Sequence, residues 1–411
     1  MNQTNGTASP LSVVLEYMNS LNRNYTSLPA EERVAMGFVR RVQSYNWTLE
    51  LVFVGIVLFM IGLYKYGTSA NVSRANKLFD SVHAFLRDEL SFSRVGFTVP
   101  GSKDIIYMDQ HLHTWMTSFA TGRSCIDCIN VNLHLFPRNN PLSMFLENVV
   151  GWYFPILAFD IDNEFCEVIV RPNGVYVASE AANVNSNAKE LLTGSFKFIA
   201  SIVNKRVMNQ SRHDNYYLAL THTTDSDEIP EEYVYMCEMN QLSGFFGAYS
   251  KQGALNELLK QASDFLDFIS FTDLPGEKPE NVSVWNATRL QRCVIRTKVP
   301  TSKRDLDLLN RIIALVVEIY DNYTRVLVQK SEPAFITADM LKKTGNLRTI
   351  EQEKIAKAAR EAALAAEKEN QKDIEREKRR NLKKSGELEK LDKKMKEKRE
   401  RRQRNKQKVR M

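Results

Sequence analysis

Residues 51–64 read LVFVGIVLFMIGLY, in which every residue is apolar or glycine. Together with the preceding Trp47–Glu50 they make a stretch of 18 residues. As a helix this stretch is about 27 Å long, just enough to cross a bilayer. Aromatic residues at both ends fit interfacial anchors, whereas Glu50 has to lie near the headgroups. We therefore predict one transmembrane helix over residues 47–66, preceded by a flexible or weakly helical segment over residues 1–46.

Two other interpretations of this stretch stay open. A buried core helix is one, because an uninterrupted apolar run of this length is shorter than most membrane spans. A cleaved signal peptide is the other, since Thr68-Ser69-Ala70 resembles a small-residue cleavage site. The segment in front of the apolar run lacks the basic start of a signal peptide, which favours the transmembrane interpretation.

Flanking charge does not decide the orientation of the span, because three basic residues lie close to it on each side. Glycosylation sequons are equally uninformative, because they occur both before and after the apolar run, at Asn2, Asn5, Asn24, Asn46, Asn71, Asn209, Asn281, Asn286 and Asn322. The basic C-terminal segment described below decides the matter: an RNA partner lies on the cytosolic side. We expect a luminal N-terminus and a cytosolic C-terminus.

The chain has 411 residues, which predicts two or three structural units. Its charge is unevenly distributed. Residues 351–411 carry 23 basic and 13 acidic residues, whereas the other 350 residues carry 33 basic and 36 acidic ones. A near-neutral body followed by a basic segment indicates an acidic partner for that segment, either nucleic acid or an anionic membrane surface. The five scattered cysteines do not form a disulfide framework, so a reducing compartment is expected for the body.

Residues 75–330 read as one α+β cytosolic domain. Apolar and polar residues alternate over Ile129–Leu135, the period of a half-buried strand. Further strands are predicted at 167–171, at 175–177 after a turn at Asn173-Gly174, at 216–220 and at 233–236. Helices are predicted at 188–208, 254–269 and 305–329, the last with apolar residues spaced by three and four.

Signals for catalysis or metal binding are weak. Cys125 and Cys128 have CxxC spacing but run into a strand instead of starting a helix, and no second cysteine pair accompanies them. His111 and His113 lack a third ligand at a recognisable spacing. Asp160, Asp162 and Glu164 alternate without the glycine and terminal glutamate of a calcium loop. No phosphate-binding loop or nucleophile elbow is present, so we predict a non-enzyme without cofactor or metal.

Residues 331–411 form a basic segment that lacks proline after Pro333 and aromatic residues after Phe335. Such a segment cannot fold on its own, but its Ala, Glu, Lys and Arg residues favour an exposed helix. Its few apolar residues do not sustain a heptad, and Ser385-Gly386 is expected to break the helix. The candidate ribosome- or RNA-binding residues are Arg376, Lys378, Arg379, Arg380, Lys383, Lys384, Lys393, Lys394, Lys396, Lys398, Arg399, Arg401, Arg402, Arg404, Lys406, Lys408 and Arg410.

This arrangement favours phosphate contacts without base readout, as in the recognition of structured RNA. A solvated charged helix without a ligand is the alternative, but the stretch after Glu400 contains no acidic residue, which favours a polyanionic partner. An anionic lipid surface also stays open, although the segment lacks the large apolar side chains of an interfacial helix.

From about residue 45 onward the chain resembles the calumin family, also called coiled-coil domain-containing protein 47. The most specific stretch runs from residue 115 to residue 141, and its matching residues are Trp115, Thr121, Gly122, Arg123, Arg138 and Pro141. Asn140 departs from the family pattern, which has Asp. A second similar stretch ends at Glu238, and 271–273 is a weaker match. The long acidic luminal region of animal members is absent, which removes the basis for a calcium role.

The resemblance implies an endoplasmic reticulum membrane protein of the multipass translocon. It implies partners: the ribosome near its exit tunnel, contacted through ribosomal RNA, the Sec translocon, an Asterix-like small membrane subunit, and nascent multipass membrane proteins. Such a complex acts as an intramembrane chaperone, because an unpaired polar group in hydrocarbon is costly. The Thr121-Gly122-Arg123 motif is interpreted as a structural turn, since glycine permits a sharp bend and Arg123 can pair with an acid.

Two alternative functions are also compatible with the sequence. A membrane-anchored RNA-binding protein unrelated to insertion would contact messenger RNA through the same basic segment. A luminal thiol oxidoreductase would need signal cleavage near Ala70 and reactive Cys125 and Cys128.

Overall fold

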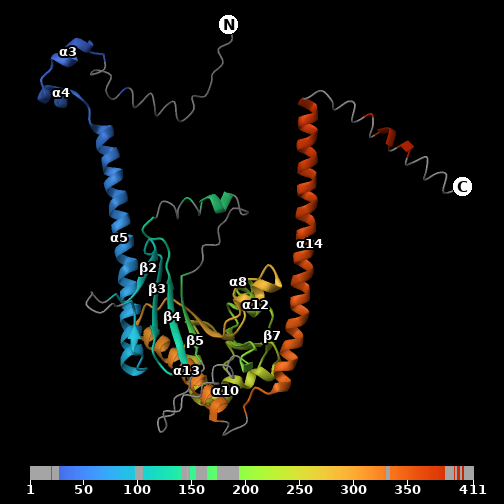
Figure 1. Cartoon of the computed structure of the whole chain (residues 1–411). Helices are drawn as coiled ribbons and strands as arrows, with labels where there is room; N and C mark the ends of the chain where they lie inside the picture. The colour runs from blue at the N-terminus through green and yellow to red at the C-terminus, as the bar shows by residue number, and fades with distance from the viewer. Residues whose placement is uncertain are drawn as a thin grey trace. The chain divides into compact units, whose positions relative to one another are not determined.

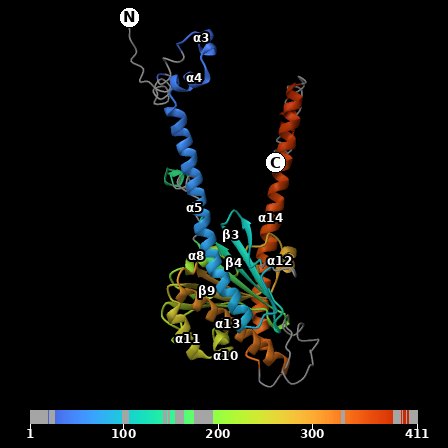
Figure 2. The same ribbon diagram turned by 90° about the vertical axis from the view of Figure 1, so that its left-hand side faces the viewer.

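The computed structural model describes residues 27–97, 105–140, 149–153, 164–173, 194–329 and 334–384, together with single residues at 20, 146, 393, 396–398, 400 and 401. The chain divides into two compact units. The first contains residues 1–83, 97–118 and 132–165, and the second contains 84–96, 119–131 and 166–411. Figure 1 shows the elements of both units, and Figure 2 shows them from a second side.

The first unit is built on a long helix, α5 (Thr48–Ala84), which follows two short helices, α3 (Ala30–Ala35) and α4 (Phe38–Ser44). The Asn46 side chain caps α5 by accepting a hydrogen bond from the amide of Thr48. Among the described residues, α5 is the one helix long and apolar enough to cross a membrane, and only 6% of its most apolar window is buried. This exposure contradicts the alternative of a buried core helix.

The first unit also contains β2 (Met108–His111) and the adjoining parts of β3 (Trp115–Thr121) and β4 (Ile126–His134). β2 and β3 pair antiparallel, with Met108 opposite Thr117. Along β3 and β4 buried and half-buried side chains alternate, so each strand presents one face to the core.

In the second unit the strands follow the order β1-β3-β4-β5-β10-β9-β6-β8-β7. The remaining strands are β1 (Arg94–Val95), β5 (Phe165–Pro172), β6 (Ala200–Asn204), β7 (His222–Thr224), β8 (Tyr233–Cys237), β9 (Leu266–Thr272) and β10 (Arg292–Lys298). β6 lies between β8 and β9 and pairs antiparallel with both. Every residue of β6 and β8 is buried, because both faces of this part of the sheet are covered.

Helix α13 (Lys303–Gln329) carries the apolar stripe predicted from the sequence and buries it in the core. Its Tyr320 and Tyr323 join an aromatic cluster with Phe196, Phe245 and Phe271. The π-helix η1 (Phe85–Glu89), the 3₁₀ helix η3 (Asn240–Gly244) and several short helices complete the unit: α8 (Met208–Asp214), α9 (Tyr216–Ala219), α10 (Phe245–Tyr249), α11 (Gln252–Gln261) and α12 (Val282–Thr288).

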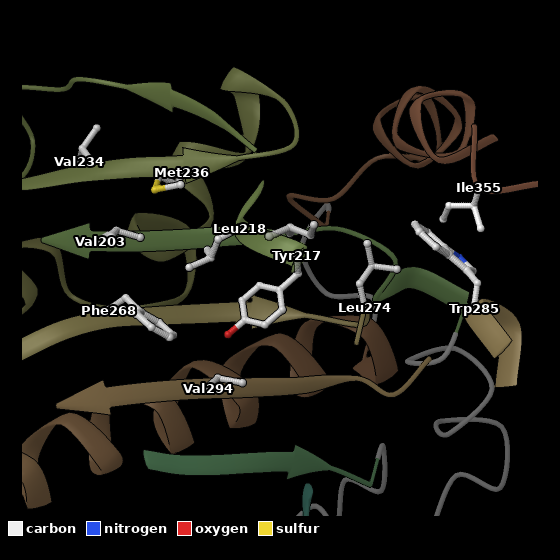
Figure 3. Close-up of a cluster of buried hydrophobic side chains, with 11 residues drawn as sticks. Val203, Tyr217, Leu218, Val234, Met236, Phe268, Leu274, Trp285, Val294 and Ile355 are labelled. Carbon is white, nitrogen blue, oxygen red and sulfur yellow. The ribbon is translucent and has the colours of Figure 1, made fainter. Parts of the chain in front are cut away.

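The C-terminal helix α14 (Ala338–Lys384) has two different halves. Its first half buries Met340, Thr344, Arg348 and Ile355, which share one face of the helix. Ile355 belongs to the same buried cluster as Trp285, and Figure 3 shows the two side chains facing each other. From Glu361 onward every described side chain is exposed. We call residues 361–384 the arm.

The mixed helix and sheet composition, the strands β4, β5 and β8 and the long helix α13 were predicted correctly. Two predictions were wrong, and a third was correct only in part. Residues 216–219 form α9 and not a strand. The helix predicted at 188–208 contains the strand β6. The helix predicted at 254–269 is confirmed by α11 as far as Gln261, but its second part contains the strand β9. These strands are buried on both faces, so they lack the alternation that distinguishes a strand from a helix. The strand predicted at 175–177 lies outside the described residues.

Candidate functional site

The first candidate site is the part of α5 that follows the apolar run, from Gly67 to Arg74, where the helix first packs against other segments. We call this region the junction. The described side chains of 51–66 are largely exposed, whereas Gly67 is buried. A Cβ atom at Gly67 would overlap with the backbone carbonyl of Arg138. Glycine is therefore required here, because the 137–140 segment lies directly against the helix backbone. One turn further along α5, the fully buried Asn71 donates hydrogen bonds to the carbonyls of His113 and Phe136, at 3.0 and 2.9 Å.

A charged cluster closes this junction. Glu164 accepts hydrogen bonds from Arg138 and from the Phe136 amide, and Arg74 of α5 contributes an ion pair at 3.1 Å. Burial alone would raise the pKa of Glu164, but these hydrogen bonds and the two guanidinium charges outweigh it and hold the pKa below its usual range. The cluster ties the helix to the later segments around Arg138 and Glu164, so the body of the first unit begins within one or two turns of the last apolar residue.

A pocket of about 580 Å³ opens beside the junction, lined by His111, Leu112, Thr114, Trp115, His134, Leu135, Pro137, Asn139 and Asn140. Trp115, a residue of the family motif, packs against His134, with ring centroids 5.0 Å apart. The β2–β3 turn borders the pocket and has two residues with positive φ, Leu112 at 42° and His113 at 59°. Asp109 stabilises this turn: its carboxylate accepts a hydrogen bond from the His113 amide and contacts the Nδ1 atom of the His113 ring.

The Thr121-Gly122-Arg123 motif is a structural turn in the second unit, as expected. Gly122 has φ of 91°, and a Cβ there would overlap with the Ser93 hydroxyl. Arg123 donates to the carbonyl of Leu90 at 2.5 Å and pairs with Asp321 of α13 at 2.7 Å. These contacts close the β3–β4 hairpin onto the core helix.

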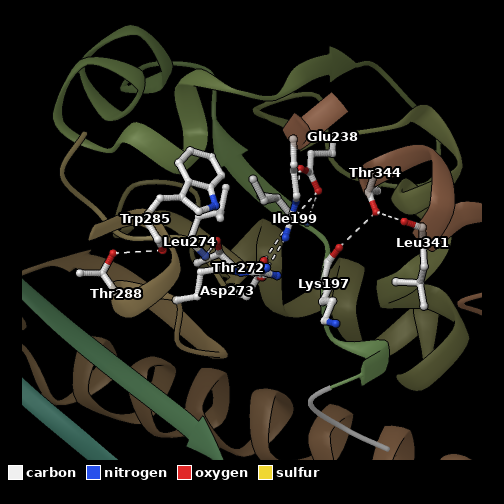
Figure 4. A network of polar contacts seen from close by, with 12 residues as sticks. Lys197, Ile199, Glu238, Thr272, Asp273, Leu274, Trp285, Thr288, Leu341 and Thr344 are labelled. Carbon is white, nitrogen blue, oxygen red and sulfur yellow. Dashed lines mark hydrogen bonds and ion pairs between the residues drawn. The ribbon is translucent and has the colours of Figure 1, made fainter. Parts of the chain in front are cut away.

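The second candidate site is the anchor of α14 on the body of the second unit. Arg348 donates to both carboxylate oxygens of Glu238, at 2.8 and 3.0 Å, and to Asp273 at 2.8 Å. Asp273 also accepts from Arg289 at 2.5 Å. The two buried carboxylates are therefore balanced by two guanidinium groups. Figure 4 shows Glu238 beside Ile199, whose amide it accepts, and Thr344 of α14 donating to the carbonyl of Lys197.

Beyond this anchor the arm extends for 24 residues, or about 36 Å. It contains eight basic and six acidic residues. Arg376, Lys378 and Arg380 are exposed, and Arg376 makes a surface ion pair with Asp373 at 3.2 Å. The structure also exposes Lys393, Lys396, Lys398 and Arg401. Arg379, Lys383 and Lys384 belong to α14, and the other basic residues of the predicted set lie outside the described residues: Lys394, Arg399, Arg402, Arg404, Lys406, Lys408 and Arg410.

Of the residues considered for redox or metal chemistry, His111, His113 and Glu164 lie at the first candidate site, whereas Cys125 and Cys128 do not contribute to it. Cys125 is buried and Cys128 half-buried. Burial is the main reason that the pKa of both thiols is raised, in Cys125 to about 12, which disfavours a reactive thiolate. Within the described part of the chain, no group of three or more His, Cys, Asp and Glu side chains has the arrangement of a metal site. Asp160, Asp162 and Pro141 lie outside that part.

Comparison with known proteins identifies relatives over most of the chain. A family model described as PAT complex subunit CCDC47 matches residues 46–402. The UPF0674 endoplasmic reticulum membrane protein YNR021W of Saccharomyces cerevisiae is 49% identical over 355 residues, which cover 86% of each chain. The UPF0674 endoplasmic reticulum membrane protein C2G5.01 of Schizosaccharomyces pombe is 25% identical over 244 residues, or 59% of each chain.

Proposed function

The chain belongs to the CCDC47 family of PAT complex subunits, and from this membership we propose that it is a ribosome-associated membrane protein of the endoplasmic reticulum. In this proposal it acts with the Sec translocon, as part of an intramembrane chaperone complex for the insertion and folding of multipass membrane proteins. The endoplasmic reticulum location is supported by the name of the yeast relative, and the candidate span in α5 supports anchoring in that membrane.

The proposed topology has a luminal N-terminus and a cytosolic C-terminus. The strands of both units, which follow the span in the sequence, then lie on the cytosolic side of the membrane, where ribosomes bind. Gly67 and Asn71 hold the strands of the first unit directly at the end of the apolar run. In this position the protein can meet a polar transmembrane segment as it leaves the translocon. An unpaired polar group in hydrocarbon is costly, so shielding it until its partner helix arrives has a physical purpose.

The observation that carries the ribosome proposal is the arm, an exposed basic helix fixed to the body at one end by a buried ion-pair network. An exposed helix with basic side chains suits the phosphates of structured RNA, which are recognised by charge and shape. The proposed partner is ribosomal RNA near the exit tunnel. The Sec translocon, an Asterix-like small membrane subunit and nascent multipass proteins are the other proposed partners. In this account no residue of the chain catalyses a reaction.

The proposal is tested by co-sedimentation of the detergent-solubilised full chain with ribosomes over a series of salt concentrations. The matched comparison is a truncation after Ala366, which removes all the candidate RNA-binding residues but keeps the Arg348 anchor and the buried Ile355. We expect salt-sensitive pelleting of the full chain that is lost on truncation. Equal pelleting of both forms would assign docking to the body. Absence of pelleting of either form at low salt would contradict ribosome association, and crosslinking of the arm to messenger RNA would then support the RNA-binding alternative.

A further inference from the structure

Two short helices in front of the span, α3 and α4, expose apolar side chains that the proposed function does not use. Phe38, Val39 and Val34 are 82, 67 and 75% exposed, and neither helix contains a buried residue. Helices of six and seven residues are not stable in water on their own, because nucleation is costly and few hydrogen bonds offset it. An additional surface must therefore stabilise them.

Helix α4 has two chemically different faces. Phe38, Val39 and Val42 follow the spacing that places three side chains on one side of a helix, and this side is apolar. Arg40 and Arg41 lie on the other side, and the helix contains no acidic residue. A basic and an apolar face on one helix are typical of segments that lie in the interface of an anionic bilayer.

Side-chain contacts hold α4 next to the start of the candidate span. The Trp47 indole donates to the carbonyl of Val42 at 2.9 Å. Tyr45 donates to Glu50 in the first turn of α5, and the Tyr45 and Trp47 rings are in edge contact at 4.9 Å. Figures 1 and 2 show α3 and α4 at the N-terminal end of α5. These contacts provide Glu50 with a partner where the helix enters the hydrocarbon.

The position of α4 along the bilayer normal follows from the chain itself. Ser44 ends α4 three residues before Trp47, so the end of the helix lies within about 10 Å of that indole. Tryptophan at the end of an apolar run marks the headgroup level. The exposed apolar face of α4 therefore lies close, along the chain, to the exposed apolar side chains that α5 presents from Leu51 onward.

We propose that α4 lies flat in the headgroup layer of the leaflet at the N-terminal end of the span, with Phe38, Val39 and Val42 in the acyl boundary. Its occupant is the phospholipid surface, with Arg40 directed at lipid phosphates. Arg41 donates to the Val34 carbonyl at 2.6 Å and adds a second positive charge on the same side of the helix. The inference requires insertion of α5 but not ribosome binding, so it goes beyond the proposed function. In this position α4 fixes the depth and the tilt of the span in the bilayer.

The test uses the full chain with Cys128 replaced by Ser, because the other four native cysteines are buried. A fluorescent label is attached to Val39→Cys on the apolar face or to Ser44→Cys, its matched control on the opposite, polar face of α4. The proteins are reconstituted in phosphatidylcholine vesicles containing phosphatidylserine. A third variant, Leu58→Cys, reports insertion of the span through quenching by a lipid with a deep spin label, and only inserted protein is analysed.

We expect a lipid spin-labelled near the headgroup to quench the label at position 39 about twofold or more, and a water-soluble quencher to act mainly on the label at position 44. Adding Arg40→Gln and Arg41→Gln should reduce the lipid quenching at position 39. Equal quenching of both labels by the water-soluble quencher, in protein whose Leu58→Cys variant is inserted, would overturn the proposal.

Discussion

Arg348 of α14 forms a bidentate ion pair with Glu238, the residue that follows β8, and both side chains are almost completely buried. Asp273, which follows β9, completes the network. Glu238 and Asp273 end the second and third stretches that resemble the family, and the structure brings both to the same arginine. The resemblance in these stretches thus coincides with the anchor of the arm and not with a catalytic centre.

Replacing Arg348 by Met should destabilise the chain by about 3–5 kcal/mol, because two buried carboxylates lose their charge partner. The control is Arg376→Met in the same helix, whose ion pair with Asp373 is exposed and contributes about 0.5 kcal/mol or less. Urea unfolding followed by circular dichroism measures both. Equal stabilities of the two variants would contradict a structural role of the anchor.

Replacing Gly67 by Ala should loosen the junction at the end of the span, because the new methyl group overlaps with the Arg138 carbonyl. Gly62→Ala is the matched control, five residues earlier on the same helix, where a Cβ meets no atom within 4 Å. We expect faster hydrogen exchange of the 113–117 and 134–140 amides in Gly67→Ala alone. Unchanged exchange there would show that the close approach is not needed.

The Glu164 cluster should contribute stability at neutral pH that disappears in acid. A folded-state pKa below the unfolded value means that the contribution is complete above about pH 4.3 and is lost as the pH falls through the folded pKa. Glu164→Gln should therefore be less stable by about 1–3 kcal/mol at pH 7 and match the parent chain near pH 3. Urea unfolding at both pH values checks this, and a constant difference would contradict the assigned charge state.

Asp267 in β9 should have the opposite dependence. Burial raises its pKa to about 6, against the smaller opposing effects of Arg296 and Lys298. The folded state then retains a proton that the unfolded state releases, so stability falls as the pH rises from about 4 to about 6. Asp267→Asn should stabilise the chain by about 1–3 kcal/mol at pH 7.5 but not at pH 4. Asp264→Asn, at an exposed position, should give no gain at either pH.

The parts predicted from the sequence are those with a clear period or an unbroken run. The apolar run of 51–64 predicts the exposed part of α5, and the three-and-four spacing in 305–329 predicts α13. The strands β6 and β9 were not predicted, because burial on both faces removes their alternation.

The candidate sites were predicted only in part. The arm was expected as an exposed helix from its composition, but its anchor was not. In a segment dominated by Lys, Arg and Glu, Arg348 is indistinguishable from solvated arginines until the sheet supplies Glu238 and Asp273 from distant positions. Gly67 and Asn71 could be found in the sequence only by their position just after the apolar run. Their roles could not be predicted, because their partners lie more than forty residues away in the sequence.

The central claim is that the basic residues of the arm carry ribosome binding, and the most direct measurement is the salt dependence of ribosome affinity in matched charge variants. Arg376→Gln, Lys378→Gln and Arg380→Gln together remove three exposed positive charges, whereas Glu367→Gln, Glu369→Gln and Glu377→Gln remove three exposed negative ones. We predict that the first set weakens binding and lowers the slope of log affinity against log salt by about two to three, while the second set binds at least as tightly as the parent chain. Identical affinities and slopes for both sets would contradict the claim.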